Sequence, residues 1–467
     1  MPEWRQKVVG HIRQAMEDGY RPVVVVSAMG RGGAPYATDT LIHLLQEITK
    51  EVVPREMDLL LSCGEIISAT VLAQTLRSAG IAALSLTGAQ AGIITDNHFG
   101  QARILEVRPA RVWKCIDSGQ VPVVAGFQGM TRDGEITTLG RGGSDTTAAA
   151  LGVALRAREV QIFTDVDGVM TADPRLVPDA RTLRMISYRE VMEMAQLGAK
   201  VIHPRAVEIA MEGGIPLRVL QTGSHGPGTM ITHQSELIVT DPEASVSLRA
   251  DRVVRAVTQI GGMARIVVED TGETTSPRVL EIFEHLSLAG ISLDMIQVEP
   301  GRLAFALNEE MTGLARSVLL GLGLKPKLEP GYVKVSVVGG GMQGVPGVMA
   351  RVLRALAGVG VQVHHSSDSH ANISLLVAAT EVPAALEALH REFLLDTEDA
   401  PPGAPVVTPP ANGVLKGLKK EEEKLFGLRE LPNPRALLER GSATVPAGGP
   451  ARQVEQGPAG ESPAEGG

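Results

Sequence analysis

A glycine-rich turn at Thr137–Gly152 carries the residues best suited to chemistry. It reads T-T-L-G-R-G-G-S-D-T-T-A-A-A-L-G, so a turn containing Arg141 runs into an alanine-rich helix with Ser144 or Asp145 at the expected N-cap. Glycines let the backbone approach a ligand closely, and the first amides of a helix have no partner within it. Together with the helix dipole and a planar guanidinium, they predict a site for a carboxylate or phosphate. The alternative is an ordinary turn before a well-capped helix.

Three other stretches combine turns, hydroxyls and charged side chains. Ser27–Gly30 reads S-A-M-G and is followed by Thr38 and Asp39. Ser62–Glu65 reads S-C-G-E and is expected to open a helix, and Phe163–Arg175 reads F-T-D-V-D-G-V-M-T-A-D-P-R. Each alone is compatible with a simple strand-to-helix turn. Four such stretches at the same end of one sheet predict a ligand cleft.

The charged side chains of this cleft have both signs. The cations are Arg141, Arg175 and Lys200, and the carboxylates are Glu65, Asp145, Asp165 and Asp173. Cations with backbone amides suit polyphosphate, whereas carboxylates suit Mg²⁺ or a substrate ammonium group. No G-x-x-x-x-G-K-[ST], H-R-D or D-F-G motif occurs, which argues against a P-loop enzyme or a protein kinase. We expect the histidines His203, His364 and His365 to be structural or surface residues.

Alternating helices and buried strands are expected to position these stretches. Helical spacing or composition marks residues 5–18, 65–79, 109–118, 146–157 and 188–196, and apolar runs mark strands at 23–26, 82–86, 121–125 and 160–164. Strands without polar alternation are typical of a parallel sheet covered on both faces. The pattern therefore predicts an α/β layered domain with a mainly parallel central sheet, whose ligands bind at the carboxyl ends of the strands.

A second region begins after a connection at residues 233–252. Ile282–Met295 resembles Val352–His365, since each is a helix that ends at glycine and continues into an alternating strand. Strands Arg265–Val268 and Val333–Val338 precede these helices, which predicts two small α+β units. Beyond about residue 396 the chain is rich in Pro, Gly, Ala and Glu, so we expect a disordered tail.

Length and composition narrow the class of protein. The 467 residues suffice for about three domains, and the net charge of −9 argues against a general nucleic-acid binder. Two cysteines, Cys63 and Cys115, form no disulfide framework and suit a reducing compartment. No long apolar run or signal-peptide segment was identified, so the expected location is the cytoplasm, without a membrane partner.

Six motifs in order carry a family resemblance. They are V-V-V-V-S-A-M-G, L-L-S-C-G-E, V-A-G-F-Q-G, T-T-L-G-R-G-G-S-D-T-T-A, F-T-D-V-D-G-V-M-T-A-D-P-R and G-A-K-V-I-H-P-R. Over residues 5–395 the chain resembles aspartate kinases of the amino acid kinase superfamily, of the monofunctional kind with two ACT domains (ferredoxin-like units). The resemblance implies phosphorylation of the L-aspartate β-carboxylate by ATP to 4-phospho-L-aspartate, the first step toward lysine, diaminopimelate, threonine and methionine. It also implies Mg²⁺ held mainly through the ATP phosphates, with no dedicated protein metal site.

The resemblance assigns substrate roles to individual residues. Ser27 and Thr38 match the aspartate pocket, Glu65 matches the residue that holds the α-ammonium group, and Arg141 pairs with a substrate carboxylate. The rest of that motif consists of Gly142, Gly143, Ser144 and Asp145, and the aspartate is expected to organise the catalytic cations.

The resemblance also assigns a nucleotide side. The matching residues are Thr164, Asp165, Met170, Thr171, Ala172, Asp173, Arg175, Lys200 and Val201. Lys200 matches a lysine near the ATP phosphates and is, with Arg141 and Asp145, a catalytic candidate. Many relatives carry tyrosine at the position of Met170, so the nucleotide contact there is expected to differ.

One family motif has no match. The family begins with a strand carrying K-[FY]-G-G, whose lysine reaches the transferring phosphate, and this motif does not occur in the chain. We expect the natural start to lie upstream of Met1, with an impaired enzyme as the alternative.

The repeat resembles a pair of ACT regulatory units that bind an amino acid and pair across subunits of a homodimer or higher oligomer. The matching effector positions are Gly344, Val345, Pro346, Gly347, Ser367, Asp368, Ser369 and His370. The S-x-D-S-H motif is closer to that of the diaminopimelate-sensitive form than to that of common lysine-sensitive forms. Lysine and threonine stay open as alternative effectors. The alternative is a repeat that serves dimerisation only.

The expected domains are a catalytic domain at 1–235, ACT units at 253–328 and 329–397, and a tail at 398–467. The resemblance implies that the second unit is inserted within the first, so Ala384–Leu395 is expected to return and complete the first unit. Two other functions stay open at this point: another amino acid kinase, such as one acting on acetylglutamate or glutamate, and a non-catalytic amino-acid sensor.

Overall fold

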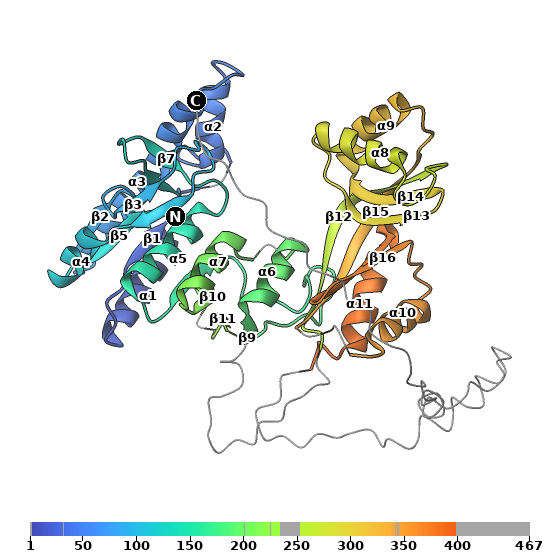
Figure 1. Ribbon diagram of the computed structural model, residues 1–467. Helices are drawn as coiled ribbons and strands as arrows, with labels where there is room; N and C mark the ends of the chain where they lie inside the picture. Colours follow the sequence, from blue (N-terminus) through green and yellow to red (C-terminus); the bar gives the residue numbers. More distant parts are fainter. Residues whose placement is uncertain are drawn as a thin grey trace, which may run out of the picture. The chain divides into compact units, whose positions relative to one another are not determined.

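The computed structural model describes residues 2–30, 32–199, 201–224, 226–233, 253–340, 342 and 345–397. The expected tail at 398–467 and the connection at 234–252 lie outside the described residues. Figure 1 shows an α/β part, coloured blue to green, and an α+β part, coloured yellow to orange.

The α/β part alternates helices and strands as the pattern predicts. Its helices are α1 (Pro2–Glu17), α2 (Thr38–Gln46), α3 (Pro54–Ser78), α4 (Ala110–Asp117), α5 (Gly143–Leu155), α6 (Tyr188–Gln196) and α7 (Pro204–Gly213). Its strands are β1 (Val24–Val26), β2 (Ala83–Leu86), β3 (Ile93–Thr95), β4 (Ile104–Val107), β5 (Val121–Ala125), β6 (Gln128–Met130), β7 (Ile136–Thr138), β8 (Val160–Thr164), β9 (Met185–Ser187), β10 (Leu217–Gln221) and β11 (Thr229–Thr232).

The strands form parallel and mixed sheets. The first has the order β1-β5-β2 with parallel pairing throughout, and Val123 of β5 lies opposite both Val24 and Ser85. The second has the order β8-β10-β11-β9, in which β10 and β11 alone are antiparallel. A third, with the order β4-β3-β6-β7, contains short strands. The expected α/β class with a mainly parallel sheet is confirmed.

Helices cover both faces of the first sheet, which explains the unbroken apolar runs. Val121, Val123 and Ala125 of β5 pack in one core with α1 and α3, whereas Val124 packs in another with α4 and α5. Successive strand residues point to opposite faces, so both faces of β5 must be apolar. Because α5 also contributes Ala149 to the core of the second sheet, this helix joins the two sheets.

Two predicted helix starts were wrong. The helix expected to open at Ser62–Glu65 begins at Pro54, so this motif lies inside α3. The N-cap of α5 is Gly142, with a φ of 69° and no side-chain cap, rather than Ser144 or Asp145. The left-handed region costs an L-residue about 1–2 kcal/mol, which favours glycine at this turn.

Helix α3 is the exception to the expected lack of a long apolar run. Its 25 residues reach a mean hydropathy of 1.5 over 18 residues, enough by length and composition to cross a membrane. Half of that window is buried inside the fold, as in the core helix of a soluble protein.

The α+β part consists of two units on one antiparallel sheet with the order β13-β14-β12-β15-β17-β16. Its helices are α8 (Pro277–Leu288), α9 (Thr312–Gly321), α10 (Val348–Gly358) and α11 (Val382–Glu392). Its strands are β12 (Ala256–Glu269), β13 (Asp294–Glu299), β14 (Arg302–Asn308), β15 (Lys327–Val338), β16 (His365–Asp368) and β17 (Asn372–Ala378). Short 3-10 turns, η2 (Glu309–Met311) and η3 (Ala379–Glu381), precede α9 and α11.

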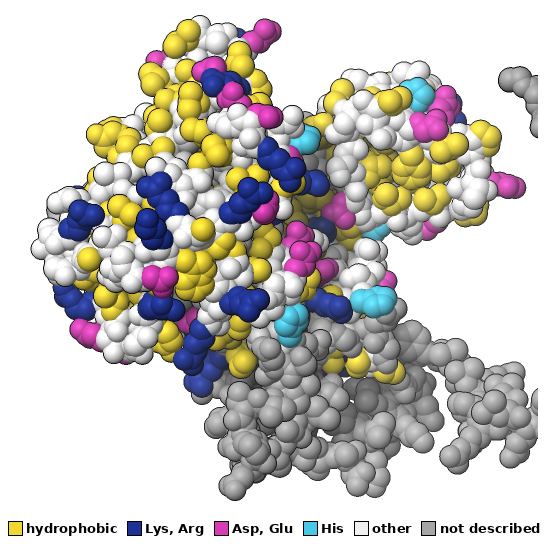
Figure 2. Space-filling view, turned by 60° about the vertical axis from the view of Figure 1, so that its left-hand side comes forward, with side chains coloured by type: hydrophobic (Ala, Val, Ile, Leu, Met, Phe, Trp, Pro, Cys, Tyr) yellow, Lys and Arg dark blue, Asp and Glu magenta, His cyan; other side chains and the backbone are white. Residues whose placement is uncertain are grey.

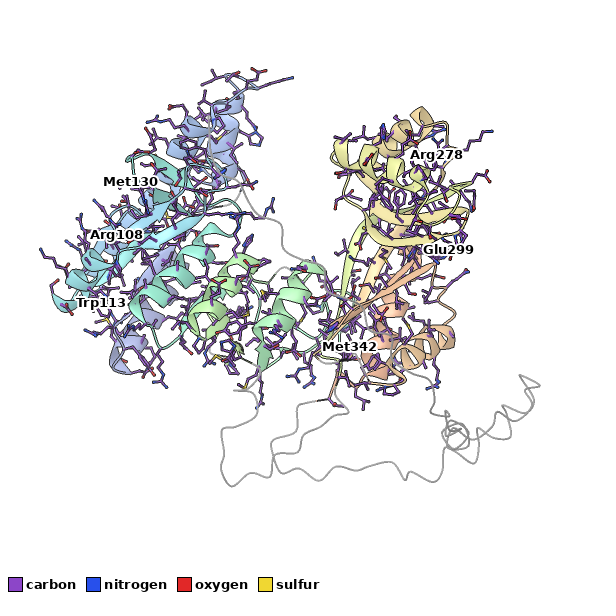
Figure 3. All side chains as sticks on the ribbon, viewed as in Figure 1. Arg108, Trp113, Met130, Arg278, Glu299 and Met342 are labelled. Carbon is purple, nitrogen blue, oxygen red and sulfur yellow. The ribbon has the colours of Figure 1, made fainter. Side chains whose placement is uncertain are left out.

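The long strands β12 and β15 serve both units. The first half of β12 pairs with the end of β15, as at Ala256 and Val338, and the second half pairs with the start of β15, as at Val267 and Lys327. Strand β15 therefore runs through the expected boundary at residue 328. One core lies under α8 and α9, and a second lies under α10 and α11 and includes Met342, labelled in Figure 3.

The segment Ala384–Leu395 does not complete the first unit. The structure places it in and just after α11, where Leu386, Leu389 and Leu395 are buried in the core of the second unit. The reason is the apolar face of α11, which packs beside α10 on the first half of β12 and the second half of β15. The two units are linked by the long strands β12 and β15 instead.

Asp58 is a buried carboxylate that the sequence did not single out. It is fully buried in α3 and accepts hydrogen bonds from the backbone N–H of Gly100 (2.9 Å) and from the N–H (2.8 Å) and hydroxyl (2.7 Å) of Thr138. Its side chain therefore fixes β7, which leads into the Arg141 turn, against α3.

Replacing Asp58 with alanine is expected to lower the free energy of unfolding by about 2–4 kcal/mol, because three buried donors lose their charged acceptor. Urea denaturation measures this change. The exposed Asp133→Ala is the control, expected within about 0.5 kcal/mol of the parent. Equal effects for the two variants would contradict the role given to Asp58.

Candidate active site

Three of the four predicted stretches meet at the carboxyl end of β5. The backbone N–H of Ala28, which follows β1, donates to Glu65 Oε1 of α3 at 3.0 Å. Gln128, just after β5, donates to the carbonyl of Ser62 at 2.8 Å. Gly126 packs so closely on α5 that a Cβ there would lie 2.9 Å from Ser144 Oγ. The structure thus brings together S-A-M-G, S-C-G-E and G-R-G-G-S-D from segments far apart in sequence.

Glu65 is the most unusual carboxylate of this group. Its side chain is 3% exposed, and among the described residues its Oε2 has no hydrogen-bond partner. Burial raises the pKa of the Glu65 carboxyl to about 7, while the hydrogen bond from Ala28 lowers it in part. A buried carboxylate oxygen without a donor is suited to a cationic ligand group.

Arg141 stands between two glycines that the turn requires. Gly140 has a φ of 74° and Gly142 a φ of 69°, and the Arg141 side chain is exposed. Within the described part of the chain no residue accepts a hydrogen bond from its guanidinium. The first amides of α5 follow directly, so a planar cation and a helix N-terminus lie next to each other.

His203 reaches this turn from the start of α7, a contact that the sequence did not predict. A Cβ on Gly142 would lie 2.2 Å from the His203 ring, and the backbone N–H of His203 hydrogen-bonds to the Asp145 carboxyl. Burial raises the pKa of Asp145, and that hydrogen bond opposes the shift. Burial also lowers the pKa of His203, helped by the nearby Arg205.

His203 is also the N-cap of α7, because its Nδ1 accepts from the Arg205 N–H at 3.4 Å. The Arg205 side chain donates to the Leu139 carbonyl at 3.2 Å, so the start of α7 holds the Arg141 turn from a second side. The expectation that His203 is structural agrees with this geometry. The sequence signal for the start of α7 is Pro204, because proline is common at the first position of a helix.

The nucleotide-side residues lie at the end of β8, in the second sheet, and in the loop that follows this strand. Thr164 ends β8 and donates to Asp165 at 3.2 Å, and Asp173 pairs with both Nε and Nη2 of Arg175. The Arg175 guanidinium lowers the pKa of Asp173. Met170 is half-buried, whereas Thr171 and Ala172 are buried against the second α+β unit.

The other predicted positions are distributed as follows. Ser27 is exposed, and Thr38 is the first residue of α2. Val201 lies in a bend before α7, and Lys200 and Gly344 lie outside the described residues. The effector positions are in the second unit: Val345, Pro346 and Gly347 precede α10, Ser367 and Asp368 belong to β16, and Ser369 and His370 form the turn to β17.

Within the described residues no three His, Cys, Asp or Glu side chains are grouped so that they could hold a metal ion. Figure 2 shows Lys and Arg side chains spread over the visible face of the α/β part among hydrophobic and other side chains.

Comparison with known proteins identifies the family. The model of the amino acid kinase family matches residues 5–221, and an ACT domain model matches residues 335–393. The chain is 42% identical over 392 residues to aspartokinase 1 of Bacillus subtilis, covering 84% of this chain and 95% of that protein. The chain belongs to the aspartokinase family.

Other aspartokinases agree with this assignment. The Thermus thermophilus aspartokinase is 40% identical over 402 residues, covering 84% of this chain and 95% of that protein. The crystal structure of Escherichia coli aspartokinase III in complex with aspartate and ADP has a TM-score of 0.59 at 27% identity, covering 76% of this chain and 80% of that one. The expectation of an aspartate kinase with ACT regulation is confirmed, and another amino acid kinase or a non-catalytic sensor is not favoured.

Proposed function

We propose that this aspartokinase binds L-aspartate at the carboxyl end of β5, between Glu65 and Arg141. The observation that carries the proposal is the buried Glu65, whose Oε2 has no partner among the described residues and whose other oxygen is fixed by Ala28. This carboxylate suits the α-ammonium group, and Arg141 suits a substrate carboxylate. Ser27, Thr38 and Gly142–Ser144 complete the pocket in this proposal.

ATP is assigned to the second sheet and the start of α7. Thr164, Asp165 and the loop Met170–Arg175 would hold the nucleotide, with Lys200 and Val201 nearby. Mg²⁺ bound through the phosphates would neutralise their charge, and Asp145 would orient this cation. The close contact of Asp145 with the start of α7 supports its place between the two halves.

The chemistry needs positioning more than proton transfer. The β-carboxylate of aspartate, with a pKa of about 3.9, is already ionised near neutral pH, so no general base is required. One carboxylate oxygen forms a bond to the γ-phosphorus of ATP as the bond to the ADP oxygen breaks, which gives 4-phospho-L-aspartate and ADP. Arg141 and the first amides of α5 would offset the negative charge that gathers at this point.

A hydroxylamine-trapping assay tests this function. With ATP, Mg²⁺ and aspartate we expect aspartyl hydroxamate, and with glutamate or acetylglutamate no signal above background.

Repeating the assay with diaminopimelate, lysine and threonine identifies the effector, for which we propose diaminopimelate at the turn before α10 and at β16. Sedimentation of the protein with and without effector tests the expected homodimer or higher oligomer. Effector binding without turnover would contradict the proposed catalysis.

The pH dependence tests the role of Glu65. Only the ionised carboxylate attracts the substrate ammonium group, and its pKa is raised to about 7 in the free protein. We therefore expect kcat/KM for aspartate to increase about tenfold from pH 6 to pH 8. Initial rates at saturating ATP measure it, with Glu65→Gln as the control that should flatten the profile. A parent profile that is flat, or that falls with pH, would contradict the assignment.

A further inference from the structure

The loop between β8 and β9 is anchored in the second α+β unit. Thr171 Oγ1 and His390 Nε2 lie 2.9 Å apart, although 219 residues separate them in sequence. Both side chains are 2% exposed. The Thr171 carbonyl also accepts from the N–H of Val257 in β12 at 2.8 Å. This part of the loop is therefore held by α11 and β12 rather than by solvent.

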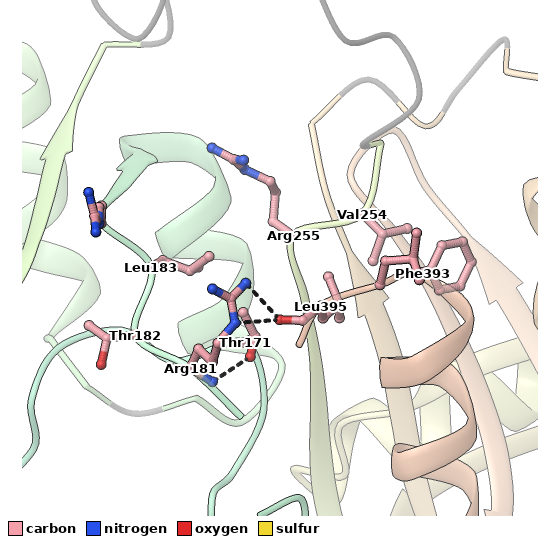
Figure 4. A pocket seen from close by; sticks show the side chains of 10 residues that line it. Thr171, Arg181, Thr182, Leu183, Val254, Arg255, Phe393 and Leu395 are labelled. Atoms are coloured by element: carbon pink, nitrogen blue, oxygen red, sulfur yellow. Dashed lines mark hydrogen bonds between the residues drawn. The ribbon is translucent and has the colours of Figure 1, made fainter. Parts of the chain in front are cut away.

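Apolar contacts strengthen the same anchor. Ala172 and Val177 of the loop are buried in one core with Leu386 and Leu389 of α11. Arg181, at the other end of the loop, donates from Nε (3.2 Å) and Nη2 (3.1 Å) to the Leu395 carbonyl, as Figure 4 shows. A cavity of about 150 Å³ lies beside these contacts, with Thr171, Arg181 and Leu395 in its wall.

The hydroxyl of Thr171 makes two hydrogen bonds at once. It accepts from the N–H of Arg181 at 2.9 Å, and its second lone pair and its proton remain for His390 Nε2, so the direction of that bond follows the imidazole tautomer. Burial lowers the pKa of His390, which favours the neutral imidazole.

We propose that His390 is a positioning residue for ATP: through its hydrogen bond with Thr171, it fixes the backbone of the loop Met170–Arg175 in its nucleotide-binding conformation. The inference rests on the proposed function, in which this loop holds the nucleotide. His390 touches neither substrate. Its effect passes through Thr171 to the neighbouring Met170 and to the Asp173–Arg175 pair on the exposed side of the loop.

Four variants test the contact. His390→Phe keeps a ring but cannot form the hydrogen bond, whereas His390→Gln offers Thr171 both a carbonyl oxygen and an amide N–H. Thr171→Val removes the hydroxyl at nearly constant volume and is combined with His390→Phe in a double mutant. Glu387→Gln, on the exposed side of α11, is the matched control. For each protein KM for ATP, KM for aspartate, kcat and the melting temperature are measured, and ATP binding is titrated calorimetrically.

Loss of the buried hydrogen bond between Thr171 and His390 predicts a KM for ATP raised about 3- to 10-fold in His390→Phe. The increase should be at least as large in Thr171→Val, which also removes the acceptor of the Arg181 N–H. KM for aspartate should change less than twofold, His390→Gln should recover most of the ATP affinity, and the double mutant should be no worse than Thr171→Val. Additive effects, equal changes in both KM values, or unchanged ATP affinity in His390→Phe would overturn the inference. A parent protein without turnover would refute the proposed function instead, and the ATP titration would still decide the role of His390.

Discussion

Replacing Arg141 with alanine is expected to lower kcat/KM for aspartate about 10²- to 10³-fold, the cost of losing a preorganised charged donor. The turn holds this arginine between two glycines of positive φ, next to the N-terminus of α5. Its guanidinium therefore needs little rearrangement to meet a carboxylate or phosphoryl oxygen. Because the side chain is exposed, the melting temperature should change little. Steady-state kinetics of hydroxamate formation and thermal denaturation measure the two quantities.

Two companion variants sharpen this test. Arg141→Lys keeps the charge but loses the planar fork, and it should recover only part of the activity. Arg132→Ala removes an exposed arginine beyond β6 and should leave kcat/KM within twofold of the parent. If Arg141→Ala and Arg132→Ala have similar activity, Arg141 does not bind substrate.

Replacing Glu65 with glutamine is expected to raise KM for aspartate about 10²-fold, because removing one partner of a desolvated charge pair costs about 2–5 kcal/mol. The amide keeps the volume and can still accept from the N–H of Ala28, so the loop after β1 should stay in place. The KM for ATP should change much less. Initial rates as a function of each substrate separate these effects.

Glu65→Gln should weaken aspartate binding without lowering the stability of the protein. Burial raises the folded-state pKa of Glu65 above its ordinary value, so the ionised carboxylate destabilises the free protein as the pH rises. The neutral amide removes this penalty, and the free energy of unfolding at pH 8 should equal or exceed that of the parent. Glu56→Gln, an exposed change on the same helix, is the control and should affect neither quantity by a large amount. A large loss of stability in Glu65→Gln would indicate a structural role only.

The elements that local patterns encode were predicted well. Helix α6 has its predicted bounds, and its start is fixed by a capping box between Ser187 and Glu190, which is a local interaction. Strand β5 also has its predicted bounds, because a five-residue run that is buried throughout has few alternatives in an α/β domain. The six motifs indicate the family without any knowledge of tertiary contacts.

Helix starts and caps were predicted less well. Ser62–Glu65 resembles a helix opening by residue type, yet α3 begins at Pro54, where proline suits the first turn. At α5 the residue types favoured Ser144 or Asp145 as the cap. The structure uses Gly142 instead, a position where the positive φ and the nearby His203 ring both favour glycine.

The sequence by itself determined the fold class, the family and the two-part order of the chain, since these follow from periodicity and from motifs of adjacent residues. Only the tertiary structure decided that Glu65 is buried with one oxygen that has no partner among the described residues, that Asp58 ties β7 to α3, and that His390 meets Thr171 across 219 residues. Such contacts depend on how cores pack, and a residue's type does not encode its distant partner. For the same reason, the glycine-rich turn was recognised as a candidate anion site from its residues alone. Its likeness to known motifs pointed to aspartate, and its place beside Glu65 became visible only in the fold.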